Sequence, residues 1–368
     1  MPLWRFFKQH TVFLVAALAA LVTCCIVPPD AQYAGYFDWN TLACLFVTLA
    51  VVCALRNIKF FTIVARSLVR ITGNLRALFL MLIAITFLGS MLIANDMALI
   101  TFLPLGYFAL TTVGQERYMA YLFILQNISA NLGGMLTPFG NPQNLYLYSY
   151  FNIPTGEFCS IMLPPFVLAV SLLALACLPV KAVRLTIDER FGEKLKRGRT
   201  ALYLALFAAS LLMVFRVIPF WAGLAGITAA LLVCDREALK MVDYPLLGTF
   251  FFFFIFAGNL ARIEAVNQWL SYLLQKDTLL VSVFSCQFIS NVPTAVLFSR
   301  FTGNYRALLL GVNIGGTGTL IASLASLITF SEFRILYPGH GKRYFWMFTA
   351  VNAAFLLVMT LVTRLFWV

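Results

Sequence analysis

Long apolar runs separated by short polar segments make up most of this 368-residue chain. Nine runs are long enough, or nearly so, to cross a bilayer, whose hydrocarbon core takes about 20 residues of helix. Two further apolar stretches, 77–113 and 278–299, are each divided by a polar cluster. The pattern predicts an all-α polytopic membrane protein with about nine transmembrane helices and two re-entrant hairpins. The spans are expected at 11–28, 39–55, 118–150, 161–180, 201–217, 220–234, 245–260, 307–330 and 346–365, with the third and eighth interrupted.

Composition excludes most other classes of protein. The chain is 62% hydrophobic and 11% charged, whereas soluble domains are roughly 45–50% apolar and about 25% charged. The formal charge of +12 comes from basic residues in short loops, so it does not indicate nucleic-acid binding. Neither His10 nor His340 stands at a metal-binding spacing, and no catalytic set can be assembled from the polar residues within the spans. We therefore expect neither an enzyme nor a bound cofactor.

The distribution of positive charge predicts the orientation of the chain. With a cytoplasmic N-terminus and hairpins that enter and leave on one side, 20 of the 26 Lys and Arg residues face the cytoplasm. The positive-inside rule favours this orientation, with the C-terminus outside an inner membrane. Residues 1–10 and the apolar run after them have the form of a signal peptide. No convincing cleavage site precedes Pro28, so we interpret 11–28 as a retained first helix.

Self-comparison shows that the chain contains a repeat. Residues 131–145 align without gaps to residues 313–327, on either side of a polar segment, 181–200, that we predict to be a cytoplasmic linker. A repeat of this kind is typical of transporters built from two halves of opposite membrane orientation. The identical pairs are Asn131 and Asn313, Gly133 and Gly315, Gly134 and Gly316, Thr137 and Thr319, and Leu145 and Leu327.

Upstream of each repeat motif lies a second matching pair. Ala94-Asn95-Asp96 divides the first hairpin and Ser290-Asn291 the second, and an amphipathic stretch that suits an interfacial helix precedes each hairpin. We therefore predict two inverted repeats. The first, 1–180, contains hairpin 77–113 and broken helix 118–150, and the second, 201–368, contains hairpin 278–299 and broken helix 307–330; the amphipathic stretches are 57–72 and 262–276.

Gly-Gly pairs beside Asn, Thr and Pro in an apolar run indicate broken helices. Broken backbone is tolerated in a membrane where it lines a cavity, and its helix ends can hold a cation at carbonyls and an anion at N–H groups. Thr137-Pro138, Asn141-Pro142 and Ser290 or Asn291 before Pro293 are typical of helix starts. The alternative is that the glycines only allow close helix packing. Two matching copies favour the functional interpretation.

Asp96 is the only one of the 14 acidic residues that lies inside an apolar hairpin. An ionisable group within a membrane segment is a candidate for proton relay or cation coupling. The alternative is that Asp96 caps a helix.

These motifs resemble the ion transporter superfamily over nearly the whole chain. They are Asn95-Asp96-Met-Ala-Leu-Ile-Thr-Phe-Leu-Pro104, Asn131-x-Gly-Gly-x-x-Thr-Pro-x-Gly-Asn-Pro-Gln-Asn144, Ser290-Asn-Val-Pro293 and Asn313-x-Gly-Gly. The superfamily includes citrate-transporter-like permeases, the arsenite permease and NhaD-type sodium/proton antiporter branch, and divalent anion/sodium symporters. The resemblance implies a homodimer in which a transport domain moves like an elevator against a scaffold domain.

The resemblance also implies a binding site for substrate and ions. Asn95 and Asn291 would be possible sodium ligands. The symporters have Ser-Asn-Thr at the first tip, where this chain has Ala94-Asn95-Asp96, and the aspartate is more similar to the arsenite and sodium/proton branch. The implied site consists of Asn95, Asp96, Gly133, Gly134, Thr137, Asn141, Asn144, Ser290, Asn291, Thr294, Asn313, Gly315, Gly316, Thr317 and Thr319.

Together these features predict a secondary active transporter that moves a small anion, a di- or tricarboxylate, coupled to H⁺ or Na⁺. Asp96 is the predicted coupling residue. The alternatives are arsenite efflux, sodium/proton antiport and, with less support, an ion channel.

Overall fold

The computed structural model of the chain describes residues 11–69, 72–184 and 195–367. Every regular element in these ranges is a helix. Among the described residues, six helices are long and apolar enough to cross a membrane, and shorter apolar helices accompany them. The prediction of an all-α polytopic membrane protein is therefore confirmed. The predicted N-terminal basic segment, 1–10, and the centre of the predicted linker, 185–194, lie outside the described residues.

The helices begin and end within a few residues of most predicted spans. The first half contains α2 Thr11–Ile26, the 3-10 turn η1 Ala31–Tyr36, α3 Trp39–Asn57, α4 Phe60–Val69, α5 Leu75–Ile93, α6 Asn95–Thr112, η2 Glu116–Tyr118, α7 Met119–Gly133, η3 Gly134–Leu136, α8 Pro142–Tyr150 and α9 Thr155–Cys177. The second contains α10 Arg197–Val214, α11 Phe220–Cys234, α12 Arg236–Lys240, α13 Tyr244–Arg262, α14 Glu264–Ile289, α15 Asn291–Phe298, α16 Tyr305–Ile314, α17 Leu324–Leu336 and α18 Gly341–Phe366.

Local sequence explains where many of these helices start. A polar side chain at the N-cap accepts a hydrogen bond from a backbone N–H of the first turn, which would otherwise lack a partner. The residues that do this are Asp38, Asn74, Asp235, Asp243, Asn304 and Ser323.

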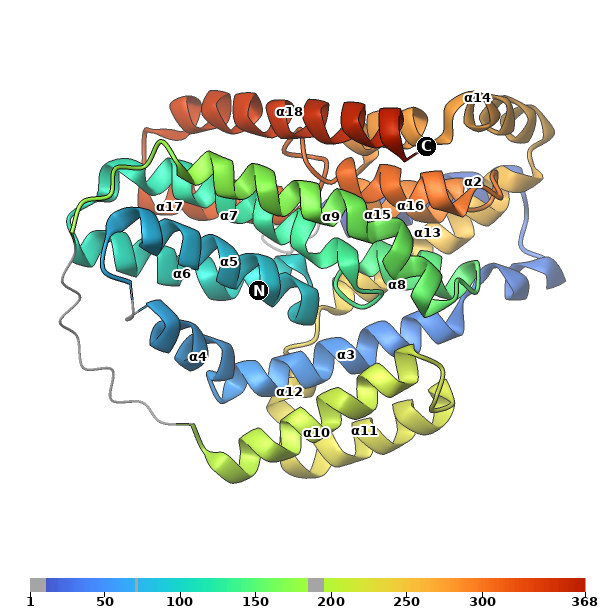
Figure 1. Cartoon of the computed structure of the whole chain (residues 1–368). Helices are drawn as coiled ribbons and strands as arrows, with labels where there is room; N and C mark the ends of the chain where they lie inside the picture. The colour runs from blue at the N-terminus through green and yellow to red at the C-terminus, as the bar shows by residue number, and fades with distance from the viewer. Residues whose placement is uncertain (1–10, 70–71, 185–194, 368) are drawn as a thin grey trace.

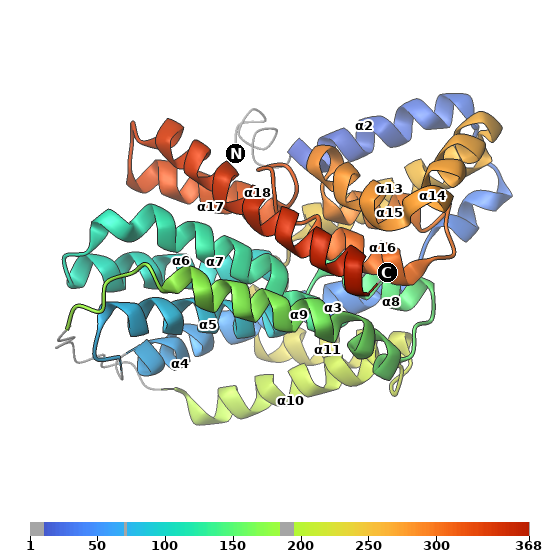
Figure 2. The ribbon, with the colours of Figure 1, turned by 45° about the horizontal axis from the view of Figure 1, so that its top comes forward.

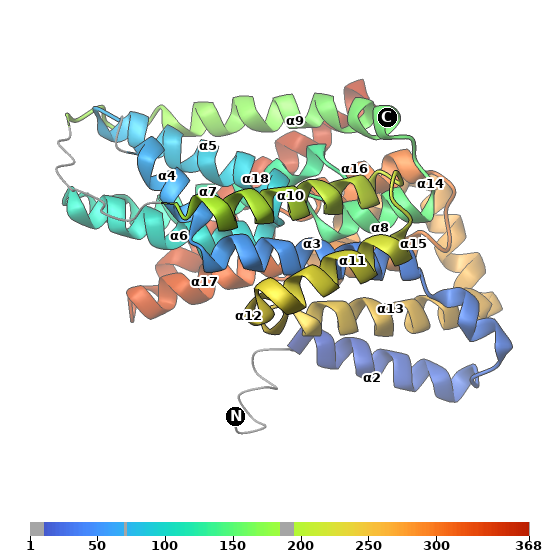
Figure 3. The same cartoon turned by 90° about the horizontal axis from the view of Figure 1, so that it is seen from below.

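The helices form a layered bundle. α3 packs against α10 and α11, and these helices with α12 form the lower layer in Figure 1 and lie nearest the viewer in Figure 3. α2 packs along α13 at one end of the molecule (Figure 2). At the centre, every residue of α7 from Leu122 to Gly133 is buried, as expected for a helix that is enclosed by others on all sides.

Each predicted hairpin is a pair of helices joined at a single residue. Ala94 joins α5 to α6, and Ser290 joins the end of α14 to α15. Both residues have positive φ, 60° at Ala94 and 71° at Ser290, a backbone region that costs a non-glycine residue roughly 1–3 kcal/mol. α14 is itself divided at Asp277, where the backbone is not helical, so the predicted amphipathic stretch and the hairpin arm are separate segments.

Both predicted helix breaks are present, but one expected helix start is wrong. α7 ends at Gly133 and α8 begins at Pro142, while α16 ends at Ile314 and α17 begins at Leu324. Thr137-Pro138 does not begin a helix. The Thr137 hydroxyl donates instead to the Met91 carbonyl of α5 at 2.9 Å, so it is not available as a cap. The chain continues as a loop to Asn141.

Candidate functional site

A cavity of about 650 Å³ lies where the two hairpin turns approach each other. Asn95 and Asp96 line it from the first turn, and Ser290 and Asn291 from the second. The first turns of α8, α13 and α17, together with α2, complete the wall. Five helices, α6, α8, α13, α15 and α17, thus begin at one cavity. The positive end of each helix dipole lies there, an arrangement that attracts an anion.

The two tip asparagines are held in the same way. The Asn95 Oδ1 accepts the N–H of Asp96 at 3.0 Å, and the Asn291 Oδ1 accepts the N–H of Val292 at 2.9 Å. Their other contacts differ. Asn95 donates through Nδ2 to the Asn131 Oδ1 at 3.1 Å. The backbone N–H of Asn291 donates instead to the carbonyl of Ala322, just before α17, at 3.0 Å. Each tip is therefore attached to a different helix break.

Asp96 does not cap a helix. The N-cap position of α6 is Ala94, and no side chain caps this helix. The Oδ1 atom of Asp96 is buried and has no hydrogen-bond partner among the described residues. Asp243 lines the same cavity from the start of α13, but its Oδ1 accepts the N–H of Leu246 at 2.9 Å. Asp96 therefore has a carboxylate oxygen without a hydrogen-bond partner among the described residues, whereas one oxygen of Asp243 is used to cap a helix.

A chain of buried amides and hydroxyls runs inward from the first tip. Asn131, the partner of Asn95, donates to the Asn127 carbonyl at 3.2 Å. Asn127 donates to Ser326 at 3.3 Å and accepts from Thr329 at 3.4 Å, and both of these lie on α17. The first tip is thus connected to the second broken helix.

Three asparagines form a second bridge between the breaks. Asn313, at the end of α16, donates to the Asn144 Oδ1 at 2.6 Å, and Asn141 donates to the Asn313 Oδ1 at 3.4 Å. Asn144 also donates to the carbonyl of Gly134 at 3.1 Å and to that of Met135 at 3.2 Å. All three asparagines are almost fully buried. The two breaks therefore satisfy part of each other's polar surface, as buried polar groups require.

The glycines at the breaks allow the hairpins to approach closely. A methyl group on Gly133 would lie 2.5 Å from the Ser90 Oγ, and one on Gly315 would lie 2.9 Å from the Cys286 Cβ. Ser90 and Cys286 each precede a hairpin turn by four residues. Gly134 and Gly316 are equally crowded by Asn141 and Asn291. Both glycine pairs thus support close packing of hairpin against broken helix.

The two threonines of the repeat make the same contact. The Thr319 hydroxyl donates to the Gln287 carbonyl at 2.9 Å, three residues before the second turn, just as Thr137 donates to Met91 before the first. The Gln287 side chain also donates to the carbonyls of Gly315 and Thr317, at 3.0 and 3.2 Å. The Gln287 side chain therefore fixes the backbone conformation of the second break.

Of the predicted site residues, four line the cavity: Asn95, Asp96, Ser290 and Asn291. The others are not among the lining residues. One of them, Thr294 on α15, donates its hydroxyl to the Ser290 carbonyl at the second turn, at 2.7 Å. The rest lie at the two helix breaks: Gly133, Gly134, Thr137, Asn141, Asn144, Asn313, Gly315, Gly316, Thr317 and Thr319. Five residues that take part in the site were not predicted from the sequence: Asn127, Asp243, Gln287, Ser326 and Thr329. Of these, Ser326 matches Asn144 in the repeat alignment, which was the signal available for it.

Comparison with known proteins identifies the family. The model of the citrate transporter family matches residues 4–305. The chain belongs to the citrate transporter family. Its relatives include an uncharacterized transporter of Methanocaldococcus jannaschii, 32% identical over 90% of this chain and 91% of that protein. The inner membrane protein YbiR of Escherichia coli is 26% identical over 98% of this chain and 96% of that protein. The silicon efflux transporter LSI3 of Oryza sativa subsp. japonica is 30% identical over 42% of this chain and 31% of that protein.

The family match and the transporter relatives show the general class of this protein. The protein is a multi-pass membrane transporter and not an enzyme. The resemblance to the ion transporter superfamily is confirmed at this level.

Proposed function

We propose that this citrate transporter family member is a secondary active transporter that moves a small di- or tricarboxylate, coupled to H⁺ or Na⁺. The observation that supports it most is the convergence of five helix N-termini on a cavity of about 650 Å³. Such a volume is within the range of small-molecule sites, and the helix ends supply N–H groups and positive potential for carboxylates.

Asp96 is the proposed coupling residue. Asp96 follows the tip residue Asn95 and lines the same cavity as the proposed anion, and its Oδ1 has no hydrogen-bond partner among the described residues. A carboxylate that carries a proton or a sodium ion does not repel the anion, whereas a free carboxylate does. Loading of the cation would therefore favour binding of the substrate, which is the thermodynamic requirement for coupling.

The proposed arrangement includes a homodimer in the inner membrane, two inverted repeats and an elevator movement of the hairpins and broken helices. Asp243 lines the cavity and follows the short helix α12, Arg236–Lys240, which the charge distribution assigns to the cytoplasm. The structure would then correspond to the state whose cavity faces inward.

The test is uptake of labelled citrate and succinate into proteoliposomes under separately imposed sodium and pH gradients. We expect saturable uptake driven by one of the two gradients. Asp96→Asn should lose the gradient dependence or the transport, while Asp235→Asn, at a capping aspartate that does not line the cavity, serves as the control. Gradient-dependent uptake by the Asp96 variant at the wild-type rate would refute the coupling role. Conductance without saturation would indicate a channel.

Two observations favour a second candidate, efflux of an uncharged oxyacid such as arsenite. The chain has a local match to a silicon efflux transporter, and its first tip reads Ala94-Asn95-Asp96 where the symporters have Ser-Asn-Thr. Expression in a sensitive host distinguishes the candidates, since efflux predicts raised tolerance to arsenite, and sodium/proton antiport predicts raised tolerance to sodium at alkaline pH. Unchanged tolerance together with citrate uptake would exclude both.

A further inference from the structure

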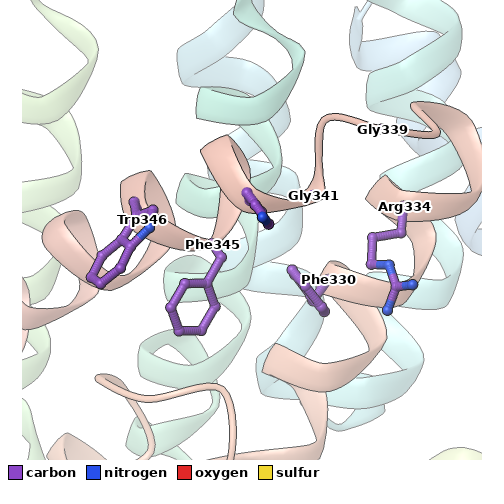
Figure 4. Close-up of a pocket in the computed structure, with 7 residues that line it drawn as sticks. Phe330, Arg334, Gly339, Gly341, Phe345 and Trp346 are labelled. Carbon is purple, nitrogen blue, oxygen red and sulfur yellow. The ribbon is translucent and has the colours of Figure 1, made fainter.

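A second pocket, separate from the proposed transport site, lies at the junction of α17 and α18. It has a volume of about 470 Å³ and is lined by the end of α17, the connecting loop and the first turns of α18. Figure 4 shows Arg334 and Phe330 on one side and Phe345 and Trp346 on the other, with Gly339 in the loop between the helices. None of its lining residues is shared with the cavity at the hairpin tips.

The polar groups of this pocket are positively charged. Arg334 and Lys342 line it, and no carboxylate does. Neither cation forms a side-chain hydrogen bond or an ion pair with a described residue; the Arg334 guanidinium lies over the Phe330 ring, 5.6 Å from its centroid. The nearest acidic residue in sequence, Glu332, lies two positions before Arg334 and outside the lining. The pocket therefore presents two cations, neither of which forms an ion pair with a described carboxylate.

The apolar groups of this pocket face the surroundings of the bundle. Trp346 is 70% exposed, and Ile335, next to Arg334 on α17, is 68% exposed. α18 is a candidate membrane span of 26 residues, and these side chains belong to the ends of the two helices. Exposed aromatic side chains at the end of a span are typical of the membrane interface. The cations therefore lie at the depth of the lipid headgroups.

We propose that this pocket binds the phosphate headgroup of an anionic phospholipid. Arg334 and Lys342 contact the phosphate from either side, and Phe330, Phe345 and Trp346 pack against the glycerol and the upper acyl chains. Basic pockets between helix ends on the cytoplasmic side are suited to anionic headgroups, and the charge distribution assigns the α17 to α18 loop to that side. The choice of occupant follows from the combination of two cations with exposed aromatic side chains, Trp346 and Phe345, at the end of a candidate membrane span.

The experiment measures binding of short-chain phosphatidylglycerol to the purified protein in a neutral detergent. Phosphatidylcholine with the same chains and inorganic phosphate are titrated in parallel. We expect saturable binding of phosphatidylglycerol, at least tenfold tighter than that of either comparator. Each cation contributes about fivefold near an anionic headgroup, so Arg334→Gln with Lys342→Gln should weaken binding about thirtyfold.

Arg197→Gln with Arg199→Gln provides the matched control. It also removes two exposed charges from a predicted cytoplasmic end, but on α10, which lies on the opposite side of the bundle from α18 (Figures 1 and 2). We expect binding within twofold of wild type. The exchange Arg334→Lys with Lys342→Arg keeps both charges and should retain most of the binding.

Three outcomes would overturn the proposal. Equal losses in the pocket variant and the control would mean that diffuse surface charge attracts the lipid. Equal binding of phosphatidylcholine would remove the requirement for an anion. Inorganic phosphate binding as tightly as phosphatidylglycerol would show a site for a free anion and not for a lipid.

Discussion

Asn313 provides the sharpest test of the bridge between the two helix breaks. Its amide donates to the Asn144 Oδ1 at 2.6 Å and accepts from Asn141 at 3.4 Å, and it also donates to the Leu309 carbonyl one turn earlier. Asn313→Ala removes all three contacts. Asn352 is the matched control, because it is equally buried and donates to the Phe348 carbonyl one turn earlier at 3.0 Å.

The difference between the two substitutions isolates the bridge. Both variants lose a buried amide and one bond to the preceding helical turn. Only Asn313→Ala leaves the Asn144 Oδ1 without its partner, and orphaning a buried acceptor costs about 1–3 kcal/mol. The longer Asn141 contact adds about 0.6 kcal/mol, the average for hydrogen bonds between membrane helices. We therefore expect Asn313→Ala to be less stable than Asn352→Ala by about 1.6–3.6 kcal/mol.

The measurement is unfolding of the purified protein by SDS in mixed micelles, followed by the loss of helical circular dichroism. Transport by the same variants is measured in proteoliposomes, where Asn313→Ala should also be slower because the breaks border the proposed substrate cavity. Equal free energies of unfolding for the two alanine variants would refute the reasoning, since the bridge would then contribute nothing beyond the local bond. Asn313→Asp keeps the shape but replaces the donating amide by an acceptor, and should therefore not restore the stability.

Three further predictions test packing, charge and topology. Gly133→Ala places a methyl group 2.5 Å from the Ser90 Oγ and closer still to a carbonyl of α5. The free energy of unfolding should therefore fall by about 1–3 kcal/mol, and an unchanged melting temperature would contradict this prediction. Arg262 holds the pKa of Asp30 below its usual value of 3.8, so Asp30→Asn should lower the melting temperature at pH 7, and this deficit should vanish as the pH falls through the lowered pKa; a deficit that persists in acid would exclude the ion pair as its cause. Alkaline phosphatase fused after the last residue should be active in cells, whereas a fusion in 181–200 should be inactive; the reverse result would invert the predicted orientation.

The sequence was sufficient to predict the helices because their causes are local. The start of α13 was expected at residue 245 and lies at 244, since Asp243 caps it and apolar residues follow without interruption. The hairpin turns were recognisable from small polar residues within apolar runs. Between α7 and α8, however, Thr137-Pro138 and Asn141-Pro142 both have the pattern of a helix start. Only the contact of the Thr137 hydroxyl with the Met91 carbonyl decides between them. That contact spans 46 residues, so no local pattern contains it.

The site was predicted less completely, for the same physical reason. Asn127 lies in the middle of a helix that is buried on all sides, and its importance comes from Ser326, 199 residues away. Gln287 resembles any polar residue near the end of a helix until its amide is seen to contact the second break. The repeat pattern revealed which residues are special, whereas distinguishing the cavity wall from its support required their positions in space.

The bridge between the breaks also affects the order in which the protein can be assembled. Synthesis proceeds from the N-terminus, so Asn127 and Asn144 enter the membrane before Ser326 and Asn313 have been made. The first half is then covalently complete, yet Asn127 and Asn144 still lack their partners from the second half. A nascent chain halted in the linker would be a target for quality control, and two separately expressed halves should be stable only when they meet.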